Sequence, residues 1–306
     1  MKYTHITVDA GAAAKFFHVV WNNPTEFAKV LVHLGDFHCF MELFSVIGKV
    51  VRGSGFEEAV YQAGLCTSGG INGVLSGKHY NRSWFVNERF AEAVERLFCE
   101  IYVDKPSEEL EKSLKDVATA ADCKEVTTGA AFTRYEEHYE HKKEQCRQGN
   151  YGKTAQFWMN YVEMVNTLHK LHFSVNINDF ALRLHCWEEL VSLCFATNKQ
   201  NYARYGSYYC LQLRNLDLTH PGAREELEEN GLSVCRNQLN IRQSIDGAGE
   251  QTFMKSSKTA GTYNIYDTSR LPSLTSVAYV LFEYICCVEK TVSGINRNCL
   301  FLRLFN

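Results

Sequence analysis

The chain has 306 residues, of which 45% are hydrophobic and 22% are charged, and its formal net charge is −3. This composition is close to the globular average and excludes collagen, a coiled coil and wholesale disorder, while the length suits one or two domains. The near-neutral charge excludes a uniformly basic nucleic-acid coat, but it is compatible with local basic patches.

Twelve cysteines are scattered along the chain, and no two of them form a CxxC pair. The common zinc knuckles and ribbons therefore lack their ligand spacing. The first 14 residues also lack the basic and long apolar regions of a signal peptide. We therefore expect reduced, mostly buried thiols in an intracellular protein of the nucleus or cytoplasm that is not secreted.

The first predicted elements form a strand–helix–strand unit. Residues 6–9 are a short β-branched run ending in an acid, residues 10–21 are rich in alanine with helical apolar spacing, and residues 30–34 are a second candidate strand. Such a unit is expected to be a right-handed crossover between parallel strands. Residues 35–38 are predicted to close the second strand.

From residue 40 onward the apolar spacing becomes helical. Helices are predicted over residues 40–51, 56–63, 85–102, 157–172, 180–195, 202–216, 221–229 and 245–257, with a further helix opened by Pro106. Residues 118–152 are polar and predicted to be flexible or exposed, and residues 232–241 are a weak strand candidate. The apolar run 277–288 is too short to span a membrane, so no membrane partner is expected.

Candidate site residues follow the predicted strands. Asp9 ends the first strand before a helix, where open α/β sheets place ligand or metal groups, although it would also suit a helix cap. Asp36 and His38 flank Phe37, so an extended chain would put both on one side. There they could bind metal, or Asp36 could orient the His38 ring. A buried structural histidine is the alternative.

Asp246 and Glu250 are four residues apart on a predicted helix, which places both carboxylates on one face. Two like charges there repel each other unless a cation or a base lies between them. The nearest bases in the sequence are Lys255 and Lys258. A solvated acidic face is the alternative interpretation of this pair.

Two segments interleave basic and aromatic residues. Residues 78–82 include Lys78 and Arg82, and residues 199–205 include Lys199 and Arg204. Such segments can contact phosphates and stack on bases, which makes DNA a predicted partner through local patches. They can equally cap helices and lie over a core. The chain has no P-loop, nucleophile-elbow or dinucleotide-binding motif.

Several of these strings occur together in a fixed order, at residues 6–9, 34–38, 70–82, 198–205, 218–222 and 245–258. With them the chain resembles an uncharacterised family of large animal proteins, abundant in cnidarians and fishes, that looks derived from mobile elements. The resemblance covers about residues 5–261. The order of elements is also similar to the RNase H-like core of DDE transposases.

This resemblance implies a mainly α protein with a small α/β part. Its implied divisions are a partial RNase H-like βαβ unit at 1–39, a helical insertion at 40–235, a return segment with the final acid at 236–261, and an aberrant apolar tail at 262–306. It implies that Asp9 and Glu250 are catalytic, that His38 orients the site, and that Asp9, Asp36 and Glu250 hold Mg²⁺. The implied chemistry is two-metal phosphoryl transfer on DNA.

The chain departs from the DDE pattern at both ends. Only eight residues precede Asp9, which leaves no room for the strand that carries the first catalytic Asp, and residues 262–306 turn apolar and contain cysteines. We therefore expect a truncated, transposase-derived fragment that is inactive as this chain. The alternative is a non-catalytic helical module that binds DNA or protein.

Overall fold

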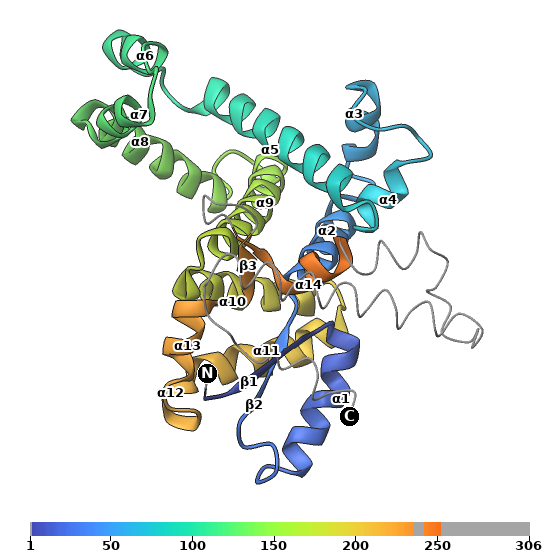
Figure 1. Cartoon of the computed structure of the whole chain (residues 1–306). Helices are drawn as coiled ribbons and strands as arrows, with labels where there is room; N and C mark the ends of the chain where they lie inside the picture. Colours follow the sequence, from blue (N-terminus) through green and yellow to red (C-terminus); the bar gives the residue numbers. More distant parts are fainter. Residues whose placement is uncertain (1, 236–241, 252–306) are drawn as a thin grey trace.

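The computed structural model describes residues 2–235 and 242–251 (Figure 1). Near the N-terminus, β1 (Thr4–Val8) pairs with β2 (Val30–Leu34) in a parallel sheet, and α1 (Ala10–Asn22) connects the two strands. The predicted strand–helix–strand unit with parallel strands is therefore confirmed. The register places Val8 opposite Leu34, so the two strands end side by side.

α1 starts where the sequence predicts, because Asp9 caps it. One carboxylate oxygen of Asp9 accepts a hydrogen bond from the backbone N–H of Ala12 at 2.8 Å. Such a cap contributes about 1 kcal/mol to helix stability. The inner face of the helix buries Ala10, Ala13 and Phe17. The cap interpretation of Asp9 is thus confirmed, and it fixes the side chain at the end of β1.

α2 (Asp36–Val51) begins four residues earlier than predicted. β2 ends at Leu34, and residues 36–38 form the first helical turn rather than the end of a strand. Residues two positions apart, such as Asp36 and His38, are separated by about 200° around a helix axis. The expectation that Asp36 and His38 share one side of an extended chain is therefore wrong, and the two side chains leave α2 in different directions.

The other described elements are mostly helical. They are α3 (Phe56–Gln62), α4 (Ile71–Leu75), α5 (Tyr80–Tyr102), α6 (Glu108–Lys115), α7 (Ala120–Thr128), α8 (Ala130–Arg147), α9 (Lys153–Ile177), α10 (Phe180–Ala196), α11 (Gln200–Arg214), α12 (Leu216–Thr219), α13 (Ala223–Asn230) and α14 (Ile245–Gly249), with an antiparallel pair of β3 (Ser233–Cys235) and β4 (Arg242–Ser244). The predicted mainly α class with a small α/β part is confirmed at this level.

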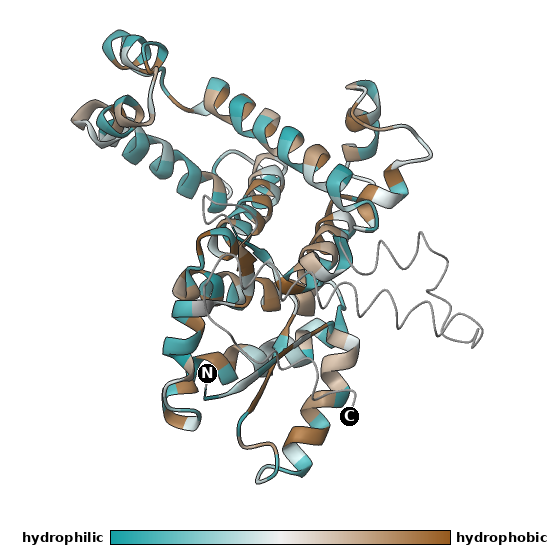
Figure 2. Ribbon diagram, viewed as in Figure 1, coloured by the Kyte–Doolittle hydropathy of each residue, from teal (hydrophilic) through white to brown (hydrophobic). Residues whose placement is uncertain are grey.

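Residues 118–152 are largely exposed, as predicted, but they form α7 and α8 rather than a flexible stretch. A reciprocal capping box between Thr119 and Asp122 starts α7. α8 buries Lys143 and Cys146 and packs on α9. Figure 2 shows that α6 and α8 are mostly hydrophilic, so local capping and one packed face are what define this region.

A continuous buried cluster joins the strand–helix–strand unit to the central helices. It includes Phe17 and Leu31 of the first unit together with Phe44, Trp187 and Tyr209 of α2, α10 and α11. The predicted division at residues 39 and 40 falls inside α2. The division into 1–39, 40–235 and 236–261 stays a prediction.

Three predictions concern residues outside the described part of the chain. They are the helix beyond residue 251, the bases Lys255 and Lys258, and the tail at 262–306. Within the described part, most cysteines are buried, as expected for structural thiols. No helix there has the length and apolarity needed to cross a membrane.

Candidate functional site

The candidate site lies at the edge of the sheet where β1 and β2 both end. Asp9 follows β1, His38 lies in the first turn of α2 after β2, and α14 with Asp246 packs against β1 and α2. Glu250 follows α14 directly. The fold therefore brings together three site residues that the sequence predicts in separate segments, Asp9, His38 and Glu250.

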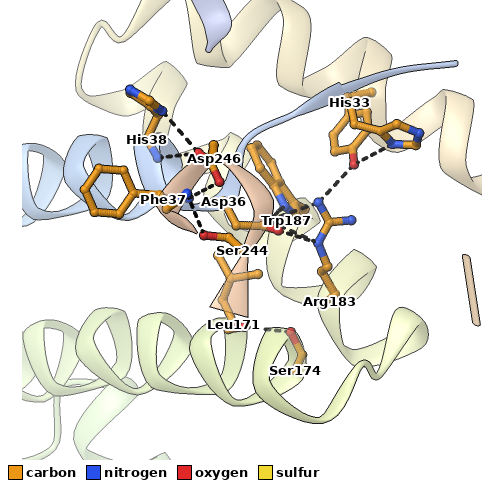
Figure 3. Close-up of polar contacts among 12 residues, drawn as sticks. His33, Asp36, Phe37, His38, Leu171, Ser174, Arg183, Trp187, Ser244 and Asp246 are labelled. Atoms are coloured by element: carbon orange, nitrogen blue, oxygen red, sulfur yellow. Dashed lines mark hydrogen bonds and ion pairs between the residues drawn. The ribbon is translucent and has the colours of Figure 1, made fainter. Parts of the chain in front are cut away.

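His38 contacts two carboxylates, and Figure 3 shows its contact with Asp246. Its Nδ1 lies 3.1 Å from Oδ2 of Asp246, and its Nε2 lies 4.0 Å from Oε1 of Glu250. The sequence predicts that a base is needed between these two carboxylates, and the structure places His38 there. About a third of the His38 side chain is exposed, against 7% for Asp246.

The electrostatics of the group favour a protonated imidazole. The hydrogen bond to Asp246 raises the pKa of His38, and the charges of Asp246, Asp9 and Glu250 raise it further against the opposing effect of burial. Burial by itself would raise the pKa of Asp246, but the bonds from His38 and from two backbone N–H groups lower it overall. Both shifts favour an imidazolium–carboxylate pair over the neutral pair.

Asp246 also caps α2 from a distant part of the chain. Its two carboxylate oxygens accept hydrogen bonds from the backbone N–H groups of Phe37, at 3.2 Å, and of His38, at 3.1 Å. Gly35 precedes the helix and has no side chain to do this. A Cβ at Gly35 would lie 2.2 Å from Oδ2 of Asp246, so glycine is required for the approach.

Asp36 lies on another side of α2, in the core. It is 2% exposed, and both its oxygens accept from Nε of Arg183, at 3.0 and 3.1 Å, while Nε1 of Trp187 donates at 3.2 Å. Burial raises the pKa of Asp36, and the guanidinium of Arg183 opposes that rise. The structure therefore does not bring Asp36 to Asp9 and Glu250, and Asp246 takes the predicted role of Asp36 in orienting His38.

A hydrogen-bonded chain continues from Asp36 through the core. Arg183 donates to the hydroxyl of Tyr209 at 3.0 Å, this hydroxyl lies 3.2 Å from Nδ1 of His33, and Nε2 of His33 lies 2.9 Å from His5. Burial lowers the pKa of His33 well below its usual value, so this histidine is neutral. These contacts form a structural network, which sequence reasoning missed because its members come from five separate elements, α2, α10, α11, β2 and β1.

An open hollow of about 520 Å³ adjoins His38. We call it the strand-end hollow, and its lining residues are Asp9–Gly11, His38, Met41, Glu42 and Asn198–Tyr202. Lys199 thus joins Asp9 and His38 in one lining. Its ammonium group lies 2.6 Å from Glu42 and donates to the Ser45 hydroxyl at 2.7 Å.

A second hollow, of about 310 Å³, lies around the turn between α10 and α11. We call it the turn hollow, and its lining residues are Cys194, Phe195, Asn198–Asn201 and Ala203–Tyr205. It shares residues 198–201 with the strand-end hollow. Arg204 is exposed there, and Phe195, at the end of α10, is 63% exposed. The position of Phe195 in the last turn of α10 is the sequence signal for this exposure.

Lys78 and Arg82 lie apart from both hollow linings. Both are exposed, Lys78 two residues before α5 and Arg82 in its first turn. Tyr80 between them packs on Phe37, with ring centroids 4.8 Å apart. This segment therefore reaches the first turn of α2 through an aromatic contact, and not through its cations.

The carboxylates in this arrangement do not fit Mg²⁺. This ion requires near-octahedral oxygen coordination, but Asp246 already accepts from three donors, Asp36 is paired with Arg183, and the His38 ring lies between Asp246 and Glu250. Among the described residues, no three His, Cys, Asp or Glu side chains are grouped so as to hold a metal ion.

The chain belongs to a protein family described as "Domain of unknown function (DUF8702)", whose family model matches residues 1–289. The predicted membership of an uncharacterised family is confirmed to this extent. No curated protein and no solved structure matches the chain.

Proposed function

We propose that the chain derives from an RNase H-like DDE transposase of a mobile element and that it now binds DNA without Mg²⁺-dependent phosphoryl transfer. The observation that carries this proposal is the meeting of Asp9, His38, Lys199 and Glu250 at the ends of two parallel strands. Ligand sites of open α/β sheets occur at this edge.

The ancestry is supported by the order and position of these residues. Asp9 follows the first strand, His38 follows the second, and the final acid Glu250 comes after a long helical segment. This is the order of the DDE core, with α14 bringing Glu250 back to the strand ends. The poor fit to Mg²⁺ supports a derived protein that has kept the position of its acids and lost the ancestral chemistry.

DNA binding is supported by the residues of the turn hollow. Arg204 supplies an exposed cation, Lys199 lines the same hollow with its ammonium paired to Glu42, and the exposed ring of Phe195 offers a surface on which a base can stack. The side chain of Lys199 does not cap α11, and backbone N–H groups at a helix start favour phosphate. Single-stranded DNA is the best match, because its bases are free to stack.

The proposal is tested by fluorescence anisotropy with a labelled 20-nucleotide single strand in EDTA. We expect affinity to fall as salt rises, and Arg204→Ala to reduce the logarithmic salt slope by about 0.7. Phe195→Ala is expected to cost about 1–3 kcal/mol of binding free energy through lost stacking.

Two variants away from the hollows provide matched controls. Arg89→Ala removes an exposed arginine of α5 that pairs with Glu92, and Leu211→Ala removes an apolar side chain of α11 that is 59% exposed. Both are expected to bind like the unmodified chain. Equal losses in all four variants, or binding indifferent to salt, would contradict DNA contact at the turn hollow.

The non-catalytic part of the proposal has its own assay, plasmid nicking with Mg²⁺. No turnover is expected from the 306-residue chain. Turnover that disappears in both Asp9→Ala and Glu250→Ala would show that the ancestral reaction persists and would overturn this part.

A further inference from the structure

We propose that single-stranded DNA continues from the turn hollow along the line where α1 and α11 meet, and that one of its bases stacks on Trp21. We call this surface the α1–α11 seam, and its members are Gly11, Lys15, His18, Trp21, Arg204 and Tyr208. The inference rests on the proposed function, because it extends the same DNA-binding surface. It gives a role to the ring of Trp21, which lies outside both hollow linings.

The ring of Trp21 is exposed and yet fixed in orientation. Trp21 is 40% exposed. Its ring stacks on Phe17, with centroids 5.7 Å apart and 12° between the planes, and makes T-shaped contacts with Tyr208 at 4.7 Å and with His18 at 5.4 Å. A ring that is already held in place loses little conformational freedom when a base stacks on it. Trp21 therefore has the properties of a stacking platform for single strands.

The turn hollow and Trp21 are connected along α11. Arg204 lines the turn hollow, and Tyr208 follows it four residues later on the same face of the helix. Tyr208 contacts Trp21 because α1 and α11 pack side by side. A strand that contacts Arg204 therefore meets the Tyr208–Trp21 pair about one helical turn, or roughly 6 Å, further along α11.

α1 leads to the same ring from the strand-end hollow. Gly11 lines that hollow, and His18 and Trp21 follow it at spacings of seven and three residues, which places all three on one face of α1. Ten residues of helix span about 15 Å. Trp21 therefore lies at the far end of a surface that begins at the two hollows.

The charge of the seam suits a polyanion. Neither α1 nor α11 contains an aspartate or a glutamate, although the whole chain has 35 acidic residues. Lys15 of α1 and Arg204 of α11 are both exposed, as is His18 beside Trp21. Phosphates along the seam therefore meet cations and no carboxylate from either helix, so the seam is a local cationic surface on a chain of net charge −3.

The first test uses tryptophan emission, with a 20-nucleotide strand of deoxythymidine in EDTA. A base that stacks on Trp21 is expected to quench part of the emission of the unmodified chain. Trp21→Phe should abolish this quenching and still bind within about twofold, because phenylalanine keeps a ring for stacking. Trp158→Phe is the matched control, because Trp158 packs on Phe90 between α9 and α5, and its quenching should persist.

The second test measures affinity by fluorescence anisotropy with the same strand. Trp21→Ala removes the platform and should weaken binding by about 5- to 150-fold. Phe173→Ala is the control, because it removes a ring of α9 that is 55% exposed and lies outside the seam. It is expected to bind like the unmodified chain. If Trp21→Ala does not fold, the quenching measured in Trp21→Phe decides the question.

Two results would overturn the inference, namely quenching that persists in Trp21→Phe and affinity in Trp21→Ala equal to that in Phe173→Ala. A loss in Phe195→Ala without a loss in Trp21→Ala would refute the seam and leave the proposed function intact. A loss in Trp21→Ala alone would support the seam and contradict contact at the turn hollow. No binding in any variant or in the unmodified chain would overturn both.

Discussion

Two charged residues in the first turn of α2 have opposite surroundings. Asp36 is enclosed by Arg183 and Trp187 in the core, whereas His38, two positions later, pairs with Asp246 at the border of an open hollow. Both form hydrogen-bonded ion pairs with a residue distant in sequence. Figure 3 shows the two pairs on different sides of the same helix start.

The difference teaches which pair is structural and which is accessible to chemistry. A buried charge without its partner has no solvent to stabilise it, so the Asp36–Arg183 pair constrains packing. A pair that water reaches contributes little to stability, because solvent screens its charges. Substitutions in the two pairs should therefore differ strongly in their effects.

The largest effect is expected for Arg183→Met. This change leaves the Asp36 carboxylate buried without its cation and should lower the free energy of unfolding by about 3–5 kcal/mol, measured by urea denaturation. Arg214→Met is the control, because it breaks an exposed pair with Glu188 and should cost no more than about 1 kcal/mol. Equal losses in both variants would remove the distinction between buried and open pairs.

An intermediate effect is expected for Asp246→Ala. It removes the cap of α2 and should cost about 1–2 kcal/mol in urea denaturation. Gly35→Ala should cost a similar amount, because its methyl group displaces the same carboxylate. Since both changes remove one contact, the double variant should be much less destabilised than the sum of the two. An additive result would contradict capping by Asp246.

The smallest effect is expected in the pH dependence of the unfolding free energy that His38 and His33 cause. Because the pKa of His38 is raised by Asp246, its stabilising contribution is complete below the unfolded value of about 6.5 and is lost as pH rises through the folded value. His33 is the opposite case. Burial lowers its pKa and keeps the ring neutral in the folded chain. The folded chain therefore loses stability as pH falls below the unfolded value of about 6.5.

The two substitutions should therefore shift stability in opposite senses. The unfolding free energy lost in His38→Gln should be about 0.5 kcal/mol greater at pH 5.5 than at pH 8.5. His33→Gln should reduce the destabilisation that the unmodified chain shows at pH 5.5. Urea denaturation at both pH values checks this, and the same sign for both variants would refute the contrast.

The sequence predicts the elements whose signals are local. The β-branched runs before Asp9 and Gly35, the alanine-rich α1, and the shared face of Asp246 and Glu250 all follow from short-range spacing. The start of α2 could not be predicted, because its capping carboxylate comes from residue 246. The burial of Asp36 could not be predicted either, because its partner Arg183 is a charged residue on the buried side of α10 and distant in sequence.

The cap that α14 provides to α2 has a consequence for the synthesis of the protein. Asp246 and His38 are separated by 208 residues. At a translation rate of about 5–20 residues per second, roughly 10–40 s pass between the appearance of the two side chains. During that interval α2 lacks its cap and the His38 imidazole lacks its carboxylate partner. The site is therefore completed only late in synthesis.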